Sequence, residues 1–193
     1  MKKNILVLGS SGQIGYHLCQ YLKKKKYKVF KFDIMDGKKY DLRINKNQLL
    51  ESYIKKSHYV FFLAFDVGGS RYLKTYQHTS DFIHNNLALM TNVFGELKNT
   101  ETPFMFTSSQ MANMSYSPYG LLKHTGELLT KALSGLTVKF WNVYGLERDP
   151  SKFHVITDFI YSAKKYGKIN MLTDGLEERQ FLYADDCCEC LYI

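Results

Sequence analysis

The segment that most restricts the fold is a glycine-rich turn near the N-terminus. Residues 5–8 before it are all apolar, as expected of a strand that is buried on both faces of a sheet. The turn carries Gly9, Gly12 and Gly15, and residues 13–22 then repeat apolar side chains at the spacing of a helix. A strand, a glycine turn and a helix in this order predict the start of a strand–helix–strand unit.

The rest of the chain up to residue 150 alternates short apolar runs with amphipathic ones. That alternation is typical of an α/β fold, in which a doubly wound parallel sheet carries helices on both faces. The ligands of such sheets bind beyond the carboxyl ends of the strands. The predicted strands are residues 29–32, 59–65, 104–106 and 136–141, and the predicted helices are residues 48–55, 79–97 and 119–133.

The pattern changes after residue 150. A helix is predicted at residues 153–165, and two short strands are predicted at residues 169–172 and 180–183. The final predicted helix begins at Asp185, a few residues before the sequence ends. We therefore expect one domain at residues 1–150 and the beginning of a second, incomplete lobe at residues 151–193.

The composition excludes several classes of protein. A chain of 193 residues with 45% hydrophobic side chains can bury one sizeable core, which excludes a disordered protein. No apolar run approaches the roughly 18 residues of a membrane helix, and the apolar run at residues 5–8 is too short for a secretion signal. We therefore expect a cytoplasmic protein without a membrane partner.

The net charge and the positions of the cysteines limit the kinds of ligand that we expect. The net charge is +8, but the lysine pairs are scattered between predicted elements and form no stripe, so we expect no nucleic-acid partner. An anionic small molecule agrees with the charge equally well. Three of the four cysteines, Cys187, Cys188 and Cys190, crowd into four positions, which suits neither a disulfide framework nor a zinc site. Free thiols and no metal are predicted.

Asp33 follows the second predicted strand and extends the evidence from the glycine turn. It lies 18 residues after Gly15, where a carboxylate accepts hydrogen bonds from the ribose of an adenine dinucleotide. Gly12 would let backbone N–H groups approach a pyrophosphate at the positive end of the helix. A 2′-phosphate would be repelled by Asp33, so NAD is predicted in preference to NADP. The alternative is a purely structural turn with Asp33 on the surface.

Tyr119 and Lys123 form a candidate proton-transfer pair. Four residues apart at the start of a predicted helix, they share one face, and we expect the ammonium group to lower the pKa of the phenol from about 10. Ser109 ends the preceding strand and would hydrogen-bond the substrate oxygen that Tyr119 deprotonates. This arrangement predicts general-base catalysis at an alcohol carbon.

Taken in order, these motifs resemble the extended short-chain dehydrogenases/reductases that act on nucleotide sugars. The resemblance covers nearly the whole chain. It implies a Rossmann-type domain that binds NAD, followed by a substrate lobe that is truncated here. It rests on the glycine turn, Asp33, Asp41-Leu42, Leu63-Ala64, Asn86, Ser109, Ser117 to Gly120 with Lys123, Trp141 to Gly145, and residues 179–186.

The same resemblance implies roles for individual residues. Tyr119 would be the base, Lys123 would bind the nicotinamide ribose, and Ser109 would polarise the sugar hydroxyl, with Gln110 beside the substrate. Asn142 and Arg179 would hold the nucleotide diphosphate of a GDP- or UDP-linked sugar. A homodimer is implied as well. The implied cofactor-binding residues are Gly9, Ser11, Gly12, Gln13, Ile14, Gly15, Asp33, Asp41, Leu42, Leu63, Ala64, Asn86, Tyr119 and Lys123, of which Asp41 and Leu42 would flank the adenine.

Met111 separates the possible reactions. Two residues after the serine, dehydratases of this family carry a Glu and 3,5-epimerases a Cys, whereas Met111 cannot transfer a proton. This favours 4-epimerisation through a transient 4-keto sugar, with hydride passing to and from NAD. If the alignment slips by one residue, Ser108 is the family serine and Gln110 the variable residue, and glutamine is no better an acid.

Three alternatives stay open. Two belong to the same family, a 4,6-dehydratase and a keto-sugar reductase. The third is a non-catalytic module that binds NAD, because most of the substrate lobe would lie beyond residue 193. The loop at residues 65–70 resembles a glycine-containing loop of enzymes that act on GDP-sugars, which points to a GDP-linked substrate.

Overall fold

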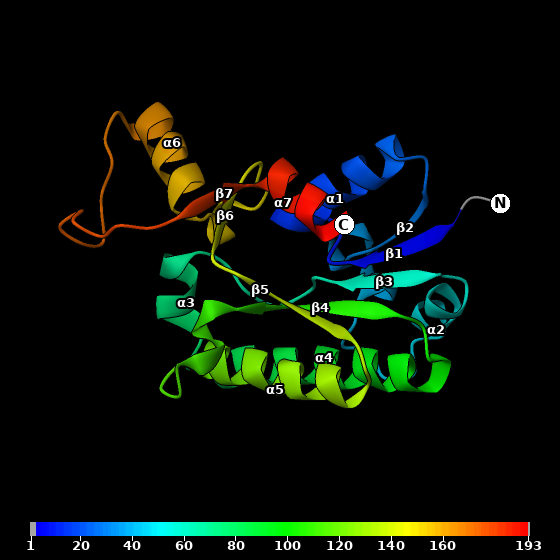
Figure 1. Ribbon diagram of the computed structural model, residues 1–193. Coiled ribbons are helices and arrows are strands. Elements are labelled where there is room, and N and C mark those ends of the chain that lie inside the picture. Colours follow the sequence, from blue (N-terminus) through cyan, green and yellow to red (C-terminus); the bar gives the residue numbers. More distant parts are fainter. Residues whose placement is uncertain (1–2, 193) are drawn as a thin grey trace.

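The computed structural model describes residues 3–192. Its centre is a five-stranded parallel sheet in the order β2-β1-β3-β4-β5 (Figure 1). The order reverses at β1 and β3, which is where doubly wound sheets bind ligands. The predicted fold class is thus confirmed. The strands are β1 (Asn4–Leu8), β2 (Lys28–Phe32), β3 (Tyr59–Phe62), β4 (Phe104–Ser109) and β5 (Leu136–Phe140).

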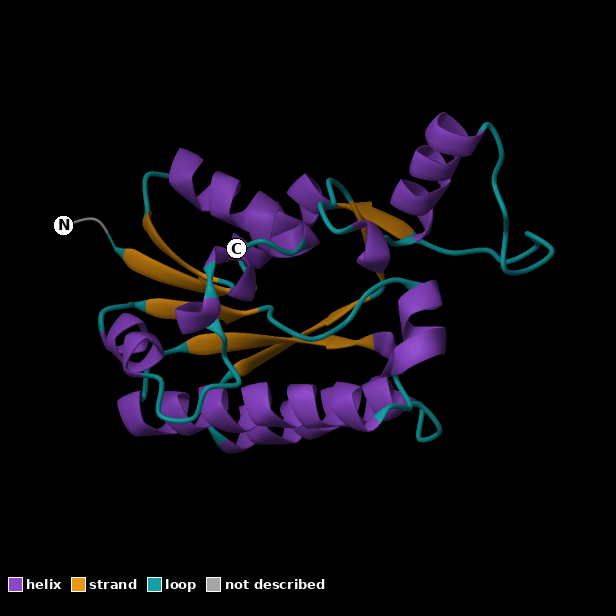
Figure 2. Ribbon diagram, turned by 180° about the vertical axis from the view of Figure 1, so that it is seen from behind, coloured by secondary structure: helices purple, strands orange, loops and turns teal. Residues whose placement is uncertain are grey.

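Helices cover both faces of this sheet (Figures 1 and 2). The helices α1 (Gln13–Lys24) and α7 (Ala184–Tyr192) pack on one face, and α2 (Gln48–Lys55), α4 (Ser80–Thr100) and α5 (Pro118–Ala132) pack on the other. No helix among residues 3–192 is long and apolar enough to cross a membrane.

The apolar run of β1 is divided between the two faces. Leu6 and Leu8 belong to the core beneath α2, α4 and α5, while Ile5 and Val7 belong to the core beneath α1 and α7. Because side chains alternate along a strand, an unbroken apolar run is what a strand covered on both faces requires.

The N-terminus of α1 differs from those of three other helices. Asn47, Thr79 and Ser117 cap α2, α4 and α5 by accepting hydrogen bonds from backbone N–H groups. The cap of α1 is Gly12, which offers no side chain, and no acidic residue follows in the first turn. The positive end of the α1 dipole is therefore left for an anion.

A smaller unit lies beyond the carboxyl ends of the large sheet. It contains a two-stranded parallel sheet of β6 (Asn142–Tyr144) and β7 (Phe181–Tyr183) and the helix α6 (Val155–Tyr166), with a long excursion of the chain between α6 and β7 (Figure 1). The helix α7, which follows this unit, packs on α1 instead. The division of the chain at residue 150 stays a prediction. The remaining elements are the helix α3 (Ser70–Tyr76), which follows β3, and the short 3₁₀ turns η1 (Ile34–Asp36), η2 (Lys38–Tyr40), η3 (Gln110–Asn113) and η4 (Pro150–Lys152).

Several local predictions were wrong. Residues 169–172 form no strand and are exposed, because β7 pairs with β6, with Asn142 opposite Phe181. Helix α3 was missed because it has only seven residues and follows Gly69. Strand β4 extends three residues further than its apolar run, because its polar end at residues 107–109 is also buried.

The cysteines are free thiols, as predicted. Cys19, Cys187 and Cys188 are buried, and Cys190 is exposed. Burial raises the pKa of the Cys19 thiol to about 11. Such a thiol stays protonated at neutral pH and packs as a small apolar side chain.

Candidate functional site

An open cavity of about 1420 Å³ lies at the carboxyl ends of the parallel strands. Its walls come from the glycine turn, the ends of β2, β3 and β4, the start of α5 and the smaller unit. All but one of the predicted site residues line this cavity, and the exception is Asn86. Those that line it are Gly9, Ser11, Gly12, Gln13, Ile14, Gly15, Asp33, Asp41, Leu42, Leu63, Ala64, Ser109, Gln110, Tyr119, Lys123, Asn142 and Arg179.

The three glycines of the turn differ in how much space a side chain would have. Gly9 has φ +84°, and a Cβ there would lie 2.7 Å from the backbone nitrogen of Ala64. A Cβ on Gly15 would lie 2.0 Å from the carbonyl oxygen of Gly9. At Gly12 the nearest such atom is 3.4 Å away, an ordinary contact. The fold therefore requires Gly9 and Gly15, whereas Gly12 leaves room beside the helix N-terminus that suits a pyrophosphate.

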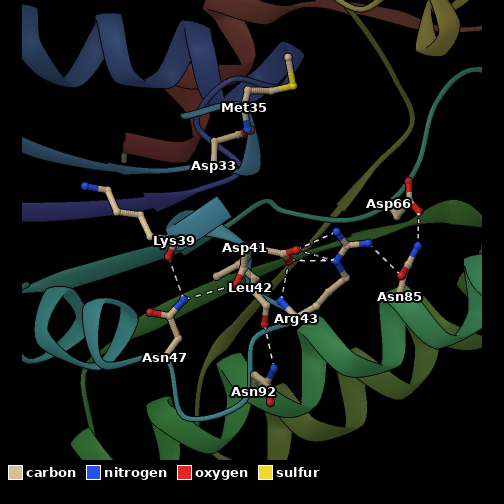
Figure 3. Close-up of polar contacts among 10 residues, drawn as sticks. All are labelled: Asp33, Met35, Lys39, Asp41, Leu42, Arg43, Asn47, Asp66, Asn85 and Asn92. Carbon is tan, nitrogen blue, oxygen red and sulfur yellow. Dashed lines mark hydrogen bonds and ion pairs between the residues drawn. The ribbon is translucent and has the colours of Figure 1, made fainter. Parts of the chain in front are cut away.

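Asp33 holds the glycine turn against the end of β2. Its Oδ2 accepts the N–H of Ser11 at 2.8 Å. Its Oδ1 accepts the N–H of Met35 at 3.0 Å, and Figure 3 shows these two residues. An ionised carboxylate has about four acceptor sites, so two are left for the hydroxyls of a ribose. The position agrees with the predicted contact to the adenosine ribose.

The loop that carries Asp41 and Leu42 is pinned from beneath. Asn92 on α4 donates to the carbonyl of Leu42 at 2.9 Å, and Asn47 donates to the carbonyls of Lys39 and Asp41 at 3.0 and 3.3 Å (Figure 3). The backbone at this end of the cavity is thus held by the buried amide of Asn47 and the partly buried amide of Asn92. A loop held in this way could form a fixed wall against which an adenine would pack.

Arg43 is a cavity residue that the sequence interpretation missed. Its Nη2 lies 2.7 Å from Oδ2 of Asp41 and its Nε 2.9 Å from Oδ1, while its Nη1 donates to Oδ1 of Asn85 at 2.9 Å. The Arg43 guanidinium holds the pKa of the Asp41 carboxyl below its usual range. The Asp41 carboxylate is therefore engaged by Arg43 in this structure. An acid followed by Arg two residues later is a signal that reasoning from sequence could have used.

Asn86 lies behind the cavity wall. It is fully buried; its Nδ2 donates to the carbonyls of Asp66 and Phe82, and its Oδ1 accepts the N–H of Asp66 at 2.8 Å. These bonds fix the loop that follows β3. Asn86 thus acts on the cavity through that loop, and a direct contact with NAD stays a prediction.

Tyr119 and Lys123 lie at the start of α5. Ser117 caps this helix by accepting the N–H of Gly120 at 3.1 Å. Lys123 is 3% exposed; its Nζ donates to the carbonyl of Thr107 at 2.8 Å and lies 3.8 Å from the centroid of the Phe65 ring. The ammonium group is 5.9 Å from the centroid of the Tyr119 ring. The predicted pair therefore meets on one face of the helix, beside Phe65.

Burial is the largest cause of the pKa shifts of Tyr119 and Lys123. It lowers the pKa of Lys123 to about 7. It also raises the pKa of Tyr119 to about 12, although the Ser109 hydroxyl acts in the opposite direction. The expected lowering of the Tyr119 pKa is therefore wrong for this structure, because burial disfavours the charged phenolate.

The low pKa of Lys123 predicts a pH-dependent stability. Between about pH 7 and the ordinary lysine pKa of about 10.4, the unfolded chain holds the extra proton, so the free energy of unfolding rises with pH. From pH 7 to 8.5 we expect a gain of about 1–2 kcal/mol. Urea unfolding of the wild type and of Lys123→Met at both pH values measures it. The gain should be absent from the variant, and equal gains in both chains would contradict the assignment.

Ser109 and Ser108 point to different partners. Ser109 accepts the N–H of Met111 at 3.2 Å and donates to Oε1 of Gln110 at 3.0 Å. The hydroxyl of Ser108 donates to Glu127 on α5, which also pairs with Lys139 at 3.1 Å. The Ser109 hydroxyl acts to lower the pKa of Tyr119, whereas that of Ser108 is engaged by Glu127, which supports the alignment in which Ser109 is the family serine.

Glu147 and His154 form a second titratable pair that the sequence interpretation missed. The Glu147 carboxylate accepts the backbone N–H of His154 at 3.0 Å and also pairs with its ring Nδ1. Burial alone would raise the pKa of Glu147, but these contacts hold it below its usual value. Both residues line the cavity. A carboxylate that binds one ring nitrogen orients the imidazole for proton transfer at the other ring nitrogen. The pair was missed because Glu147 and His154 are separated by a loop, so they do not have the spacing of a helix.

The smaller unit contributes the remaining predicted residues. Asn142 donates to the carbonyl of Gln180 at 3.1 Å and so joins β6 to the entry of β7. Arg179 donates to the carbonyl of Glu178 and is otherwise exposed at the cavity edge. The orientation in which the Gln13 amide satisfies both neighbours has it donating to Val143 and accepting from Gly145. This pairing ties α1 to β6.

One family model and one curated relative match nearly the whole chain. The model of the family described as "NAD dependent epimerase/dehydratase" matches residues 5–193. A protein of Bacillus subtilis (strain 168) named "Uncharacterized UDP-glucose epimerase YtcB" is 28% identical over 222 residues. That match covers 95% of this chain and 69% of the relative.

Solved structures share the fold at low sequence identity. Epimerase Mth375 of Methanothermobacter thermautotrophicus superposes with a TM-score of 0.85 at 21% identity, over 98% of this chain and 67% of the other. A UDP-glucose 4-epimerase from Brucella ovis in complex with NAD superposes with a TM-score of 0.79 at 17% identity, over 97% of this chain and 71% of the other. This chain therefore spans about two thirds to seven tenths of their lengths.

Proposed function

The chain belongs to the NAD-dependent epimerase/dehydratase family, and from that membership we propose that it is a nucleotide-sugar epimerase that acts at C4. The observation that carries the proposal is one cavity with the glycine turn and Asp33 at one end and Tyr119 and Lys123 at the other. Incubating the chain with NAD and a panel of UDP- and GDP-hexoses tests it. An isomerised sugar is the expected product.

Different residues along the cavity would bind NAD, orient the sugar and transfer the proton. When bound, NAD supplies hydride transfer, and the protein supplies orientation and proton transfer. The α1 N-terminus at Gly12 would hold the pyrophosphate, and Asp33 the adenosine ribose. Lys123 would hold the nicotinamide ribose while Ser109 orients the C4 hydroxyl. Tyr119 would take the hydroxyl proton as hydride leaves C4 for NAD, and would give the proton back as the hydride returns to the opposite face of the 4-keto sugar.

The nature of residue 111 supports epimerisation at C4. Met111 lines the cavity close to Ser109 and has no group that transfers a proton. Oxidation and re-reduction at C4 need only the proton that Tyr119 carries. The simplest cycle therefore uses the groups that the cavity provides.

The Glu147–His154 pair supports a second candidate, 4,6-dehydration. That reaction needs an acid or base besides Tyr119, and His154 faces the same cavity. A product that has lost water would favour this candidate over the 4-epimerase. A keto-sugar reductase would use the Tyr119 group alone.

The substrate class and the assembly are further parts of the proposal. The name of the Bacillus subtilis relative points to a UDP-linked sugar, and a GDP-linked sugar is the alternative. Exposed leucines on α4 and α5, namely Leu87, Leu121 and Leu128, support a homodimer through these helices. If the chain binds NAD but converts no sugar from the panel, it is a binding module.

Asp33 predicts a preference for NAD over NADP. A 2′-phosphate beside this carboxylate would be repelled, so NAD should bind at least about tenfold more tightly in a calorimetric titration. The variant Asp33→Ala should lose the preference. Glu51→Gln removes one negative charge on α2, outside the cavity, and should keep it. Equal affinities of the wild type for both dinucleotides would remove the argument from Asp33.

A further inference from the structure

The loop after β3, residues 65–70, packs directly on the segment at residues 147–154. The N–H of Gly69 donates to the carbonyl of Lys152 at 3.0 Å. A Cβ on Gly69 would lie 2.2 Å from the carbonyl oxygen of Phe153, and a Cβ on Gly68 would lie 3.0 Å from Cα of Lys152. The two glycines therefore permit a close contact between two backbones. That contact explains the glycine pair without a role in recognising GDP.

Asp66 is the polar centre of this contact. Its Oδ1 accepts the hydroxyl of Tyr72 at 2.7 Å and Nζ of Lys152 at 3.0 Å, and its Oδ2 accepts Nδ2 of Asn85 at 3.2 Å. Burial alone would raise the pKa of Asp66, but these partners hold it below the usual range. The side chain is therefore an ionised carboxylate with three partners from α3, α4 and η4.

The contacts of Asp66 continue to the other end of the cavity. Asn85 accepts a hydrogen bond from Arg43, and Arg43 pairs with the Asp41 carboxylate (Figure 3). A continuous chain of polar contacts thus runs from Asp41 to Lys152. Its two carboxylates and two cations balance in charge, and all of its members line the cavity.

Two ion pairs hold the segment at residues 147–154, one to the loop after β3 and one between its own first and last residues. Lys152 is held by Asp66, and His154 is held by Glu147. The segment also turns locally around Asp149, and the Arg148 guanidinium lies 4.2 Å from the centroid of the Tyr16 ring. Among these contacts, the ion pair of Lys152 with Asp66 is the one that joins the segment to the chain of polar contacts from Asp41.

We propose that Asp66 is a positioning residue that couples cofactor binding at the Asp41–Arg43 end of the cavity to the order of residues 147–154. The inference rests on the proposed function, because it takes NAD as the ligand of that end. A ligand that immobilises Asp41 and Arg43 immobilises Asn85 and then Asp66. Through Lys152, the segment that carries His154 becomes ordered as well. Such couplings are reciprocal, so an ordered segment also tightens NAD binding.

Hydrogen–deuterium exchange of the full chain with and without NAD tests the coupling. In the wild type, saturating NAD should slow exchange about fivefold or more at residues 147–154 and also at the glycine turn. In Asp66→Asn and in Lys152→Met, the glycine turn should keep its protection, while the slowing at residues 147–154 falls to less than about twofold. The variant Asp158→Asn breaks an ion pair of the same length, to Arg71, outside this chain of contacts and should behave as the wild type.

The possible failures point to different errors. Protection of the glycine turn without any protection of residues 147–154 in the wild type would overturn the coupling and leave the proposed function intact. Equal protection of residues 147–154 in the wild type and both variants would also overturn it. If NAD protects neither segment, the proposed function fails, and the coupling fails with it.

Discussion

Replacing Tyr119 by Phe is expected to lower turnover by about a hundred- to ten-thousand-fold, the range that general-base catalysis contributes. The change removes only the phenolic oxygen, and the ring keeps its edge contact with Phe65. The other predicted cofactor contacts are untouched, so the affinity for NAD should stay within about twofold of the wild type. Steady-state turnover of a converted nucleotide sugar and a calorimetric titration with NAD measure the two effects.

Tyr116 provides a matched control for this substitution. It lies three residues before Tyr119, is 77% exposed and bonds only to the sulfur of Met114. Tyr116→Phe should therefore retain the turnover of the wild type. If Tyr119→Phe keeps near-normal turnover, Tyr119 is not the base.

Substitutions in the glycine turn should separate cofactor binding from folding. Gly15→Ala places a Cβ 2.0 Å from the carbonyl oxygen of Gly9, so the turn or α1 must move. We expect a loss of about 2–4 kcal/mol in the free energy of unfolding. Gly12→Ala meets no such contact, but its methyl group would project where a pyrophosphate approaches the backbone. The expected result is near-normal stability with NAD affinity reduced by at least about tenfold.

Urea unfolding and NAD titration of the two variants check this contrast. A third variant, Gly95→Ala on α4, serves as the control because a Cβ there meets nothing within 4 Å. It should change neither property. A Gly12→Ala chain that binds NAD as tightly as the wild type would show that the turn does not hold a pyrophosphate.

The parts of the fold that could be predicted from sequence are those in which burial is local and complete. The apolar run of β1 is buried on both faces, and the glycine turn after it leaves few alternatives. Strand β4 shows where that reasoning stops. Its end is polar in sequence yet buried, because the hydroxyls find partners such as the carbonyl of Phe62, which Thr107 contacts at 3.3 Å.

Most predicted site residues share one cavity because the carboxyl ends of parallel strands meet at one edge of the sheet. The partners of those residues were not predictable. Asp66 and Lys152 are 86 residues apart in the sequence and meet at 3.0 Å. Such contacts depend on the path of the chain through the whole fold, which no local pattern encodes. The pKa of Tyr119 was misjudged for the same reason, because burial depends on the whole packing.

The path of the hydrogen at C4 distinguishes an epimerase that transfers hydride from one that exchanges a proton with solvent. The chain is incubated with NAD and a panel of UDP- and GDP-hexoses that carry deuterium at C4, and the products are analysed by mass spectrometry and NMR. We expect a C4 epimer that retains the deuterium, with no net consumption of NAD, because the hydride that leaves C4 returns to it. A C4 epimer that has exchanged its deuterium with solvent, or no converted sugar at all, would contradict the proposed epimerase.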